Sequence, residues 1–335
     1  MNLDSDMEGI IDQWEKFASP PIETLSPQNA RNAPTLKNAV EQMASDSVTV
    51  RTMNVAMPVL PEKVGRIEHL LIPGKDNEIL ARVFYPRDDD NLPVIVYFHG
   101  GGWVIANLDV YEPSCRALCN AAEAIVVSVA YRQAPEDKYP AAVEDAYAAY
   151  SWVAQNAGQL GGDPTRVAIA GESAGGNLAA VVCQMVKEKG GPPPVAQLLI
   201  YPVTDLRGRE YPSYEENTDS KPLNTAMLPW FYKYYLEDES QKNEPTASPI
   251  LAESLSGLPP AIVITAENDP LRDEGEAYAK RLADAGVSVK TQRFDGVTHE
   301  FFGLAGAVGK AKDALDFAAD GLKLSFELKS DSANL

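Results

Sequence analysis

The sequence predicts a doubly wound α/β fold with a mostly parallel central sheet. Between residues 78 and 302, short apolar runs alternate with helical patterns. Several of these runs are unbroken stretches of Val, Ile, Ala and Leu, which are typical of strands buried on both faces of a parallel sheet. The alternation of strands and helices favours a sheet that is covered by helices on both sides.

Seven segments are predicted to be strands, namely 78–85, 94–99, 124–131, 167–171, 196–201, 261–267 and 287–294. His69 lies in an earlier segment, "RIEHLLIP", that is expected to be an edge strand. Helical patterns stand between the strands, as in "AAVEDAYAAYSWVAQNA" and "EGEAYAKRLADAG". Gly286, at the end of the second pattern, is a typical residue for terminating a helix.

Two segments interrupt this alternation and are predicted to form a cap. Residues 1–50 have the pattern of an amphipathic helix, a loop and a second helix, and residues 203–246 are rich in Pro, Tyr and charge. The helix expected over 225–236 carries five aromatic residues, Trp230, Phe231, Tyr232, Tyr234 and Tyr235. Because these side chains need an apolar surface to bury against, a cap over a pocket is favoured over a solvated insertion. The remaining residues, 51–202 and 247–335, are assigned to the core.

The composition disfavours several classes of protein. The chain has 335 residues, of which 45% are hydrophobic, and this is enough for one large core or two ordinary ones. The formal net charge of -19 argues against nucleic acid and anionic membranes as partners. No apolar run approaches the length of a transmembrane helix, so no membrane insertion is expected. The acidic start, "MNLDSDMEGIIDQWEKF", lacks the features of a signal peptide, and a cytoplasmic protein is expected.

The three cysteines, Cys115, Cys119 and Cys183, cannot form a disulfide framework. Cys115 and Cys119 are four residues apart on a predicted helix, but no His or Cys pair stands nearby in the sequence to complete a metal site. We expect all three to be small buried apolar residues. Neither a metal nor a cofactor is predicted.

The stretch "VAIAGESAGGNL", residues 167–178, places one serine in an unusual setting. An apolar strand ends at Gly171, Ser173 follows in a turn of small residues, and a helical pattern begins at once. A G-x-S-x-G match by itself is a weak signal, but a strand before it and a helix after it are the context of a nucleophile elbow. Glycines around a strained serine allow neighbouring chain to pass close by. Ser173 is therefore the candidate nucleophile.

A serine hydroxyl needs a base, and the chain has only three histidines, His69, His99 and His299. His69 is interpreted as structural or solvent-facing. His99 and His299 each follow a predicted strand, and the carboxyl ends of the strands are where open α/β sheets build their sites. His99 begins "HGGGW", whose glycines suit an oxyanion hole made of backbone N–H groups. His299 remains as the general base.

The order expected for such a site is Ser, then an acid, then His. The segment "AIVITAENDPLRDEGEAYAKRL" supplies an acid directly after a predicted strand. The candidates are Glu267, Asp269, Asp273 and Glu274. From the residues alone Asp269 is the first choice, and Glu267 and Asp273 stay open as alternatives.

Five motifs in this order resemble one family. They are "HGGGW" at 99–103, "YRQAPEDKYPAAVED" at 131–145, "GESAGGNLAA" at 171–180, "DPLRDEGEAYAKRL" at 269–282 and "THEFF" at 298–302. Together they resemble the hormone-sensitive-lipase-like esterases, the microbial family IV of the α/β-hydrolase superfamily. The resemblance implies an α/β-hydrolase fold, with a mostly parallel sheet of about eight strands flanked by helices, and a helical cap formed by the N-terminal and inserted segments.

The resemblance also implies roles for individual residues. Ser173 is the nucleophile, His299 the general base and Asp269 the acid, which resolves the choice among the carboxylates. The oxyanion-hole N–H groups come from Gly101, Gly102 and Ala174, and the loop is shaped by His99 and Gly100. The chain departs from the family at two positions: Glu172 stands where Asp is frequent, and Gln133 stands where Leu is common. We expect Glu172 to alter local geometry rather than chemistry, and Gln133 to be neutral.

The expected activity is hydrolysis of short- to medium-chain acyl esters through an acyl-enzyme, without a metal or cofactor. The partner is a small-molecule ester, and the protein is expected to be a monomer or a homodimer. A triad does not distinguish esters from amides, carbamates or lactones, so these remain alternatives. A non-catalytic binding protein, such as the gibberellin receptors that look like this family, is disfavoured because those receptors lack the catalytic histidine.

Overall fold

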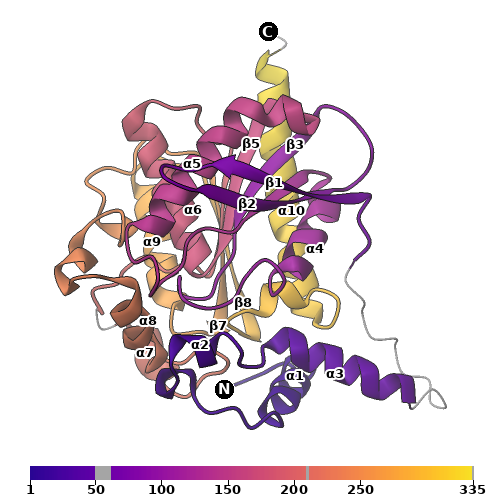
Figure 1. Cartoon of the computed structure of the whole chain (residues 1–335), viewed down its shortest axis with the longest axis vertical. Coiled ribbons are helices and arrows are strands. Elements are labelled where there is room, and N and C mark those ends of the chain that lie inside the picture. The colour runs from indigo at the N-terminus through magenta and orange to yellow at the C-terminus, as the bar shows by residue number, and fades with distance from the viewer. Residues whose placement is uncertain (50–61, 209–210, 334–335) are drawn as a thin grey trace.

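The computed structural model describes residues 1–49, 62–208 and 211–333 (Figure 1). Its centre is an eight-stranded sheet in the order β1-β2-β4-β3-β5-β6-β7-β8. The strands are β1 (Arg66–Pro73), β2 (Glu78–Tyr85), β3 (Leu92–Phe98), β4 (Ile125–Val129), β5 (Gly162–Glu172), β6 (Gln197–Ile200), β7 (Ala261–Asn268) and β8 (Val289–Thr298). Strand β2 runs antiparallel to both neighbours, and all pairs from β4 to β8 are parallel. The predicted fold class is therefore confirmed.

Ten α-helices surround the sheet in the described residues. They are α1 (Ser5–Glu15), α2 (Pro27–Ala30), α3 (Leu36–Thr49), α4 (Glu112–Ala122), α5 (Ala141–Asn156), α6 (Ala174–Lys189), α7 (Pro212–Glu216), α8 (Met227–Tyr235), α9 (Arg272–Asp284) and α10 (Gly309–Ala333). Five 3₁₀ turns join them: η1 (Ile22–Thr24), η2 (Ala157–Leu160), η3 (Glu239–Asn243), η4 (Pro249–Leu251) and η5 (Phe301–Leu304). None of the helices described here has the length and apolar character needed to cross a bilayer.

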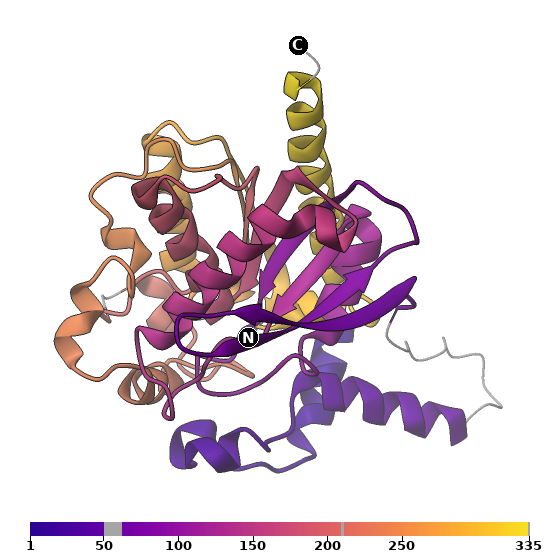
Figure 2. The ribbon, with the colours of Figure 1, turned by 45° about the horizontal axis from the view of Figure 1, so that its top comes forward.

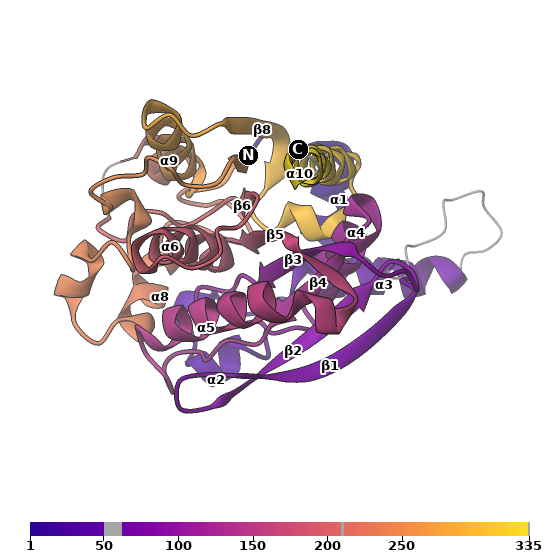
Figure 3. The same ribbon diagram turned by 90° about the horizontal axis from the view of Figure 1, so that it is seen from above.

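Both faces of the central strands such as β3 and β4 are buried, which explains their unbroken apolar runs. Along β3, Val94, Val96 and Phe98 enter one apolar cluster, with side chains of α5, α6 and α9. Ile95 and Tyr97 belong to a second cluster, with side chains of α4 and α10. Figure 3 shows α4 and α10 on the opposite side of the sheet from α5 and α6. Because successive side chains of a strand alternate between faces, a strand covered on both sides needs apolar residues at every position.

Strand β5 is longer than predicted, since it begins at Gly162 rather than at residue 167. Its first part, "GDPTR", is too polar to be recognised as a strand, yet Gly162 pairs with Leu92 across a register shift. A bulge of this kind lets a polar segment continue a strand at the end of a sheet. Strand β2 has the predicted bounds.

The two segments that interrupt the strand–helix alternation lie together at one end of the sheet, at the bottom of Figure 1 (see also Figure 2). Helices α1, α2 and α3 come from the N-terminal segment, and α7 and α8 come from residues 203–246, which we call the insertion. The helix predicted over 225–236 is observed as α8, Met227–Tyr235. The predicted boundary between residues 50 and 51 lies outside the described residues.

Candidate active site

Ser173 lies in a sharp turn between β5 and α6. Its φ is 56° and its ψ is -119°, a backbone conformation that is unfavourable for a residue with a side chain. The glycines around it are required by close backbone contacts. A Cβ atom on Gly175 would lie 2.0 Å from the carbonyl oxygen of Phe98, and one on Gly171 would lie 2.1 Å from that of Gly175. The small residues of this motif therefore hold the serine against the neighbouring strand end.

The structure brings Ser173, His299 and Asp269 together. Nε2 of His299 lies 2.9 Å from Oγ of Ser173, and Nδ1 lies 2.6 Å from Oδ2 of Asp269. All three side chains are buried. When Nδ1 donates its proton to the carboxylate, Nε2 has a lone pair that accepts the serine O–H. The arrangement has the hydrogen-bond sequence of a nucleophile, a base and an orienting acid.

The other carboxylates considered as the acid have different partners. Glu267 accepts the backbone N–H of Gly296 at 2.7 Å. Asp273 accepts from Arg272 and from the backbone N–H of Ser213. Glu274 accepts the N–H of Thr204 at 2.6 Å. Asp269 is the carboxylate that contacts His299.

The pKa values of the two buried histidines are shifted in opposite directions. Burial would lower the pKa of His299, but the Asp269 carboxylate opposes this effect, and the net shift is upward from the ordinary value. Burial lowers the pKa of His99 to about 4, despite a hydrogen bond to the Gly100 carbonyl. His99 is therefore a neutral imidazole at neutral pH, whereas the Asp269 carboxylate favours the protonated form of His299.

The loop after β3 shows why its glycines are needed. Gly101 and Gly102 have φ values of 102° and 58°, and both line the same pocket as Ser173 and His299. Nδ1 of His99 donates to the Gly100 carbonyl oxygen at 2.7 Å. A Cβ atom on Gly102 would lie 2.1 Å from the ring of Phe231 in α8. The loop is thus packed between the sheet and the insertion. Ala174, the first residue of α6, follows the serine directly.

Gln133 braces this loop, which the sequence analysis did not foresee. Its Nε2 donates to the carbonyl oxygen of Ile105 at 2.8 Å. The Tyr131 hydroxyl acts similarly, donating to the carbonyl oxygen of His99 at 2.8 Å. The expectation that Gln133 is neutral stays a prediction, although a Leu at this position could not make the bond to Ile105. A polar residue at a position that is commonly apolar was the available signal.

Glu172 is buried next to Ser173, and within the described residues it forms no ion pair. Its carboxylate accepts hydrogen bonds from the hydroxyls of Tyr97 and Tyr201. Burial raises the pKa of Glu172, and the two tyrosine hydroxyls oppose that rise. The ring of Tyr201 in turn packs on His299, with 4.5 Å between ring centroids. The longer side chain is therefore accommodated by two tyrosines, one of which packs on the imidazole of His299.

The pocket at Ser173 is mostly apolar. Residues of the N-terminal segment, including Trp14 and Ile22, line one part of it, and Leu223, Met227 and Phe231 of the insertion line another. In the described residues no cluster of His, Cys, Asp and Glu side chains could hold a metal ion.

The remaining candidates lie elsewhere. His69 accepts a hydrogen bond from Arg82 at 3.0 Å on the exposed side of β1, in agreement with a structural or solvent-facing role. Cys115, Cys119 and Cys183 are free and buried, as expected.

Comparison with known proteins places this geometry in a family. Residues 95–303 match a family model for the alpha/beta hydrolase fold. The chain is 44% identical over 282 residues to carboxylesterase NlhH of Mycobacterium tuberculosis, which covers 81% of this chain and 87% of that protein. It is 38% identical over 253 residues to an arylesterase of Saccharolobus solfataricus, with 74% and 81% covered.

Solved structures agree with this result. A hyperthermophilic esterase from the archaeon Pyrobaculum calidifontis superimposes with a TM-score of 0.84 at 38% identity, covering 96% of this chain and 98% of that one. A thermostable carboxylesterase from a metagenomic library, EstE1, gives 0.80 at 39% identity, with 90% and 98% covered. The chain belongs to the α/β-hydrolase family, in the hormone-sensitive-lipase-like group of esterases that its motifs resemble.

Proposed function

We propose that the protein is a serine carboxylesterase with Ser173 as nucleophile, His299 as general base and Asp269 as the acid that orients it. The observation that carries the proposal is the continuous hydrogen-bonded path from Ser173 Oγ through the imidazole to Asp269 Oδ2, with separations of 2.9 and 2.6 Å. The relatives named as carboxylesterases and esterases support ester hydrolysis as the reaction.

The first half of the reaction forms an acyl-enzyme. Ser173 Oγ attacks the ester carbonyl carbon while Nε2 of His299 takes the hydroxyl proton. The Asp269 carboxylate stabilises the imidazolium. The tetrahedral intermediate then collapses, the C–O bond to the alcohol breaks, and the imidazolium gives its proton to the leaving alkoxide. In the second half water attacks the acyl-enzyme by the same steps and releases the acid and the free serine.

We propose that the backbone N–H groups of Gly101, Gly102 and Ala174 stabilise the oxyanion. The support for this assignment is that both glycines line the pocket and that Ala174 follows the serine at the start of α6. His99 and Gly100 shape the loop through their mutual hydrogen bond. Donors held by a rigid backbone need no reorganisation as charge develops on the oxygen.

We propose short- to medium-chain acyl esters as substrates and the N-terminal segment and insertion as a cap. The contribution of both segments to the apolar lining of the pocket supports this assignment. The protein is proposed to act as a monomer or homodimer, which sedimentation velocity distinguishes.

The test is turnover of p-nitrophenyl esters of increasing acyl length by the unchanged protein and by Ser173→Ala and His299→Ala. Both variants should lose nearly all activity, and labelling by a fluorophosphonate probe should disappear in Ser173→Ala. Near-normal turnover by either variant would defeat the triad assignment. Rates that continue to rise beyond decanoyl esters would defeat the assignment of chain length.

A further inference from the structure

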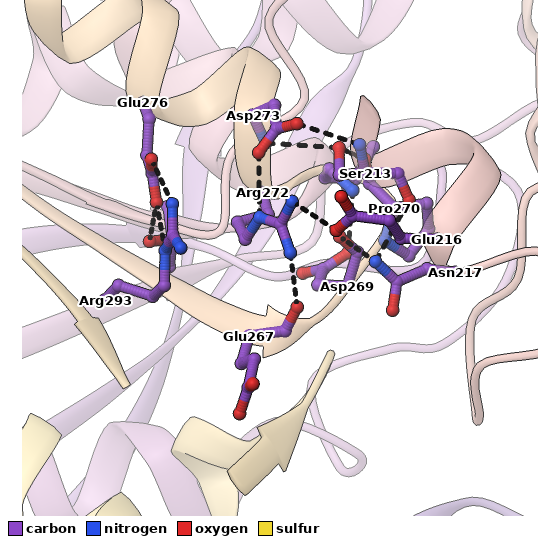
Figure 4. A network of polar contacts seen from close by, with 12 residues as sticks. Ser213, Glu216, Asn217, Glu267, Asp269, Pro270, Arg272, Asp273, Glu276 and Arg293 are labelled. Carbon is purple, nitrogen blue, oxygen red and sulfur yellow. Dashed lines mark hydrogen bonds and ion pairs between the residues drawn. The ribbon is translucent and has the colours of Figure 1, made fainter. Parts of the chain in front are cut away.

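The insertion is bonded directly to the loop that carries Asp269. Ser213, in helix α7, donates through Oγ to the carbonyl oxygen of Pro270 at 2.7 Å. Asn217, just after α7, donates through Nδ2 to the carbonyl oxygen of Asp269 at 3.3 Å. Figure 4 shows both contacts on the same side of the loop. Ser213 is fully buried and Asn217 is 4% exposed, so water does not compete effectively for these two carbonyls.

The position of the Asp269 carboxylate depends on this backbone. Oδ2 faces His299, and Oδ1 accepts the N–H of Leu271 at 2.9 Å, two residues along the same turn. An aspartate side chain is short, so a displacement of the main chain at residue 269 carries the carboxylate with it. The insertion therefore bonds to the two consecutive carbonyl oxygens, of Asp269 and Pro270, that belong to the main chain carrying this carboxylate.

Further contacts join the rest of the loop to α7. Ser213 donates its backbone N–H to Asp273 at 2.8 Å. The guanidinium of Arg272 pairs with Glu216 of α7 at 2.7 Å and donates to the carbonyl oxygen of Glu267 at 3.1 Å (Figure 4). Arg272 is largely buried, whereas Glu216 is half-exposed. The loop is thus held to α7 at Arg272 and Asp273, and Arg272 links this contact to the main chain before Asp269.

Hydrogen bonds also connect α7 and Asn217 to the segment of the insertion that precedes α8 and contributes Leu223 to the pocket. The Thr225 hydroxyl donates to the carbonyl oxygen of Tyr214 at 2.6 Å. The hydroxyl of Ser220 donates to the carbonyl oxygens of Asn217 and Leu223. Leu223 lines the pocket. One compact unit therefore contacts both the pocket and the loop of the acid.

We propose that Ser213 and Asn217 are positioning residues for Asp269, so that the insertion holds the acid in line with His299 as well as lining the pocket. The inference rests on the proposed function, since it assigns a role to the partners of the proposed triad. Its consequence is that the orientation of the acid depends on residues more than fifty positions away in the sequence, in a segment outside the core strands.

The test uses Ser213→Ala and Asn217→Leu, which remove one donor each. Thr218→Ala is the matched control, because among the described residues the exposed Thr218 hydroxyl contacts the carbonyl oxygens of Glu215 and Tyr214, both within the insertion. The profile of kcat/KM against pH is measured with a short p-nitrophenyl ester, together with Tm and the low-field proton NMR signal of the His299 Nδ1–H.

We expect kcat to fall by about 10- to 100-fold in each donor variant while KM changes little, because misplacing a catalytic group by less than 1 Å is costly. The acidic limb of the pH profile should move to lower pH, since a misaligned Asp269 raises the pKa of His299 less. Glu172 and Glu300 also raise that pKa and are unchanged in these variants. The low-field proton signal should weaken, and Thr218→Ala should match the unchanged protein.

Ser173→Ala, assayed alongside, separates the two ideas. Activity remaining in that variant would defeat the proposed function itself. If Ser173→Ala is inactive and both donor variants keep the normal limb and proton signal, the positioning role alone is overturned. Should Asn217→Leu prove too unstable, Asn217→Ser makes the smaller change and decides. Loss of the folded state in every donor variant would mark these residues as purely structural and would also overturn the proposal.

Discussion

Gly175→Ala is expected to impair catalysis although residue 175 has no side chain and carries none of the proposed triad groups. Its Cβ would lie 2.0 Å from the carbonyl oxygen of Phe98 and 2.5 Å from that of His99. Real Cβ atoms essentially never come closer than 3.0 Å to another atom in such contacts. The start of α6 and the end of β3 must therefore move apart by about 1 Å, and these elements adjoin Ser173 and the proposed oxyanion loop.

The expected losses of activity and stability follow from that displacement. A misplacement of about 1 Å costs on the order of 10²-fold in rate. Forcing a methyl group into a packed region also costs about 1–3 kcal/mol of folding free energy. We therefore expect Gly175→Ala to fold with a lower Tm and to lose about two orders of magnitude in kcat.

The assay is kcat and KM for a short p-nitrophenyl ester, with Tm from circular dichroism. Gly158→Ala is the matched control, because nothing lies within 4 Å of its added Cβ. The control should behave like the unchanged protein. A Gly175→Ala variant with normal kcat and Tm would refute the argument that close backbone approach positions the serine.

Four further predictions concern the acid, the base, the loop and a buried carboxyl. Asp269→Asn should lower kcat by on the order of 10⁴-fold, because it favours the wrong tautomer of the imidazole. In the unchanged protein kcat/KM should rise with pH through a pKa above 6.5, because the folded environment raises the pKa of His299. A flat profile from pH 5 to 8 would exclude His299 as the base. Gln133→Leu should cost about 0.5–1.5 kcal/mol by denaturant unfolding and reduce kcat, since it removes a bond to the oxyanion loop; unchanged values would contradict the bracing role. Burial raises the pKa of Glu274 to about 8, so between pH 4.5 and 8 the native state retains a proton that the unfolded chain has lost. The free energy of unfolding should therefore fall as the pH rises through this range. Glu274→Gln should flatten this dependence in urea titrations, and a dependence as steep as that of the unchanged protein would disprove the role of Glu274.

The order and type of the core elements were readable from local sequence. The runs of Val, Ile and Ala mark strands buried on two faces, and β3 confirms this by sending Val96 and Tyr97 into opposite apolar clusters. Helix α10 was not among the predicted elements. Gly321 stands inside it, where glycine is unfavourable, and only the tertiary structure supplies the reason: a Cβ there would lie 2.7 Å from Ile262 of β7.

For the candidate site, too, local sequence identified some residues, and the folded structure was needed for others. Chain order, glycine spacing and the scarcity of histidines were sufficient to select Ser173 and His299 as candidates, because these features are local or can be counted. Local sequence left the acid open among neighbouring carboxylates, and the family resemblance was needed to select Asp269. Asp269 contacts the imidazole, while Glu267, Asp273 and Glu274 accept hydrogen bonds from backbone N–H groups, and this difference depends on how the chain after β7 projects its side chains. The bonds from Ser213 and Asn217 to that turn join segments distant in the chain, and no periodicity or motif encodes such contacts, so only the folded structure could determine them.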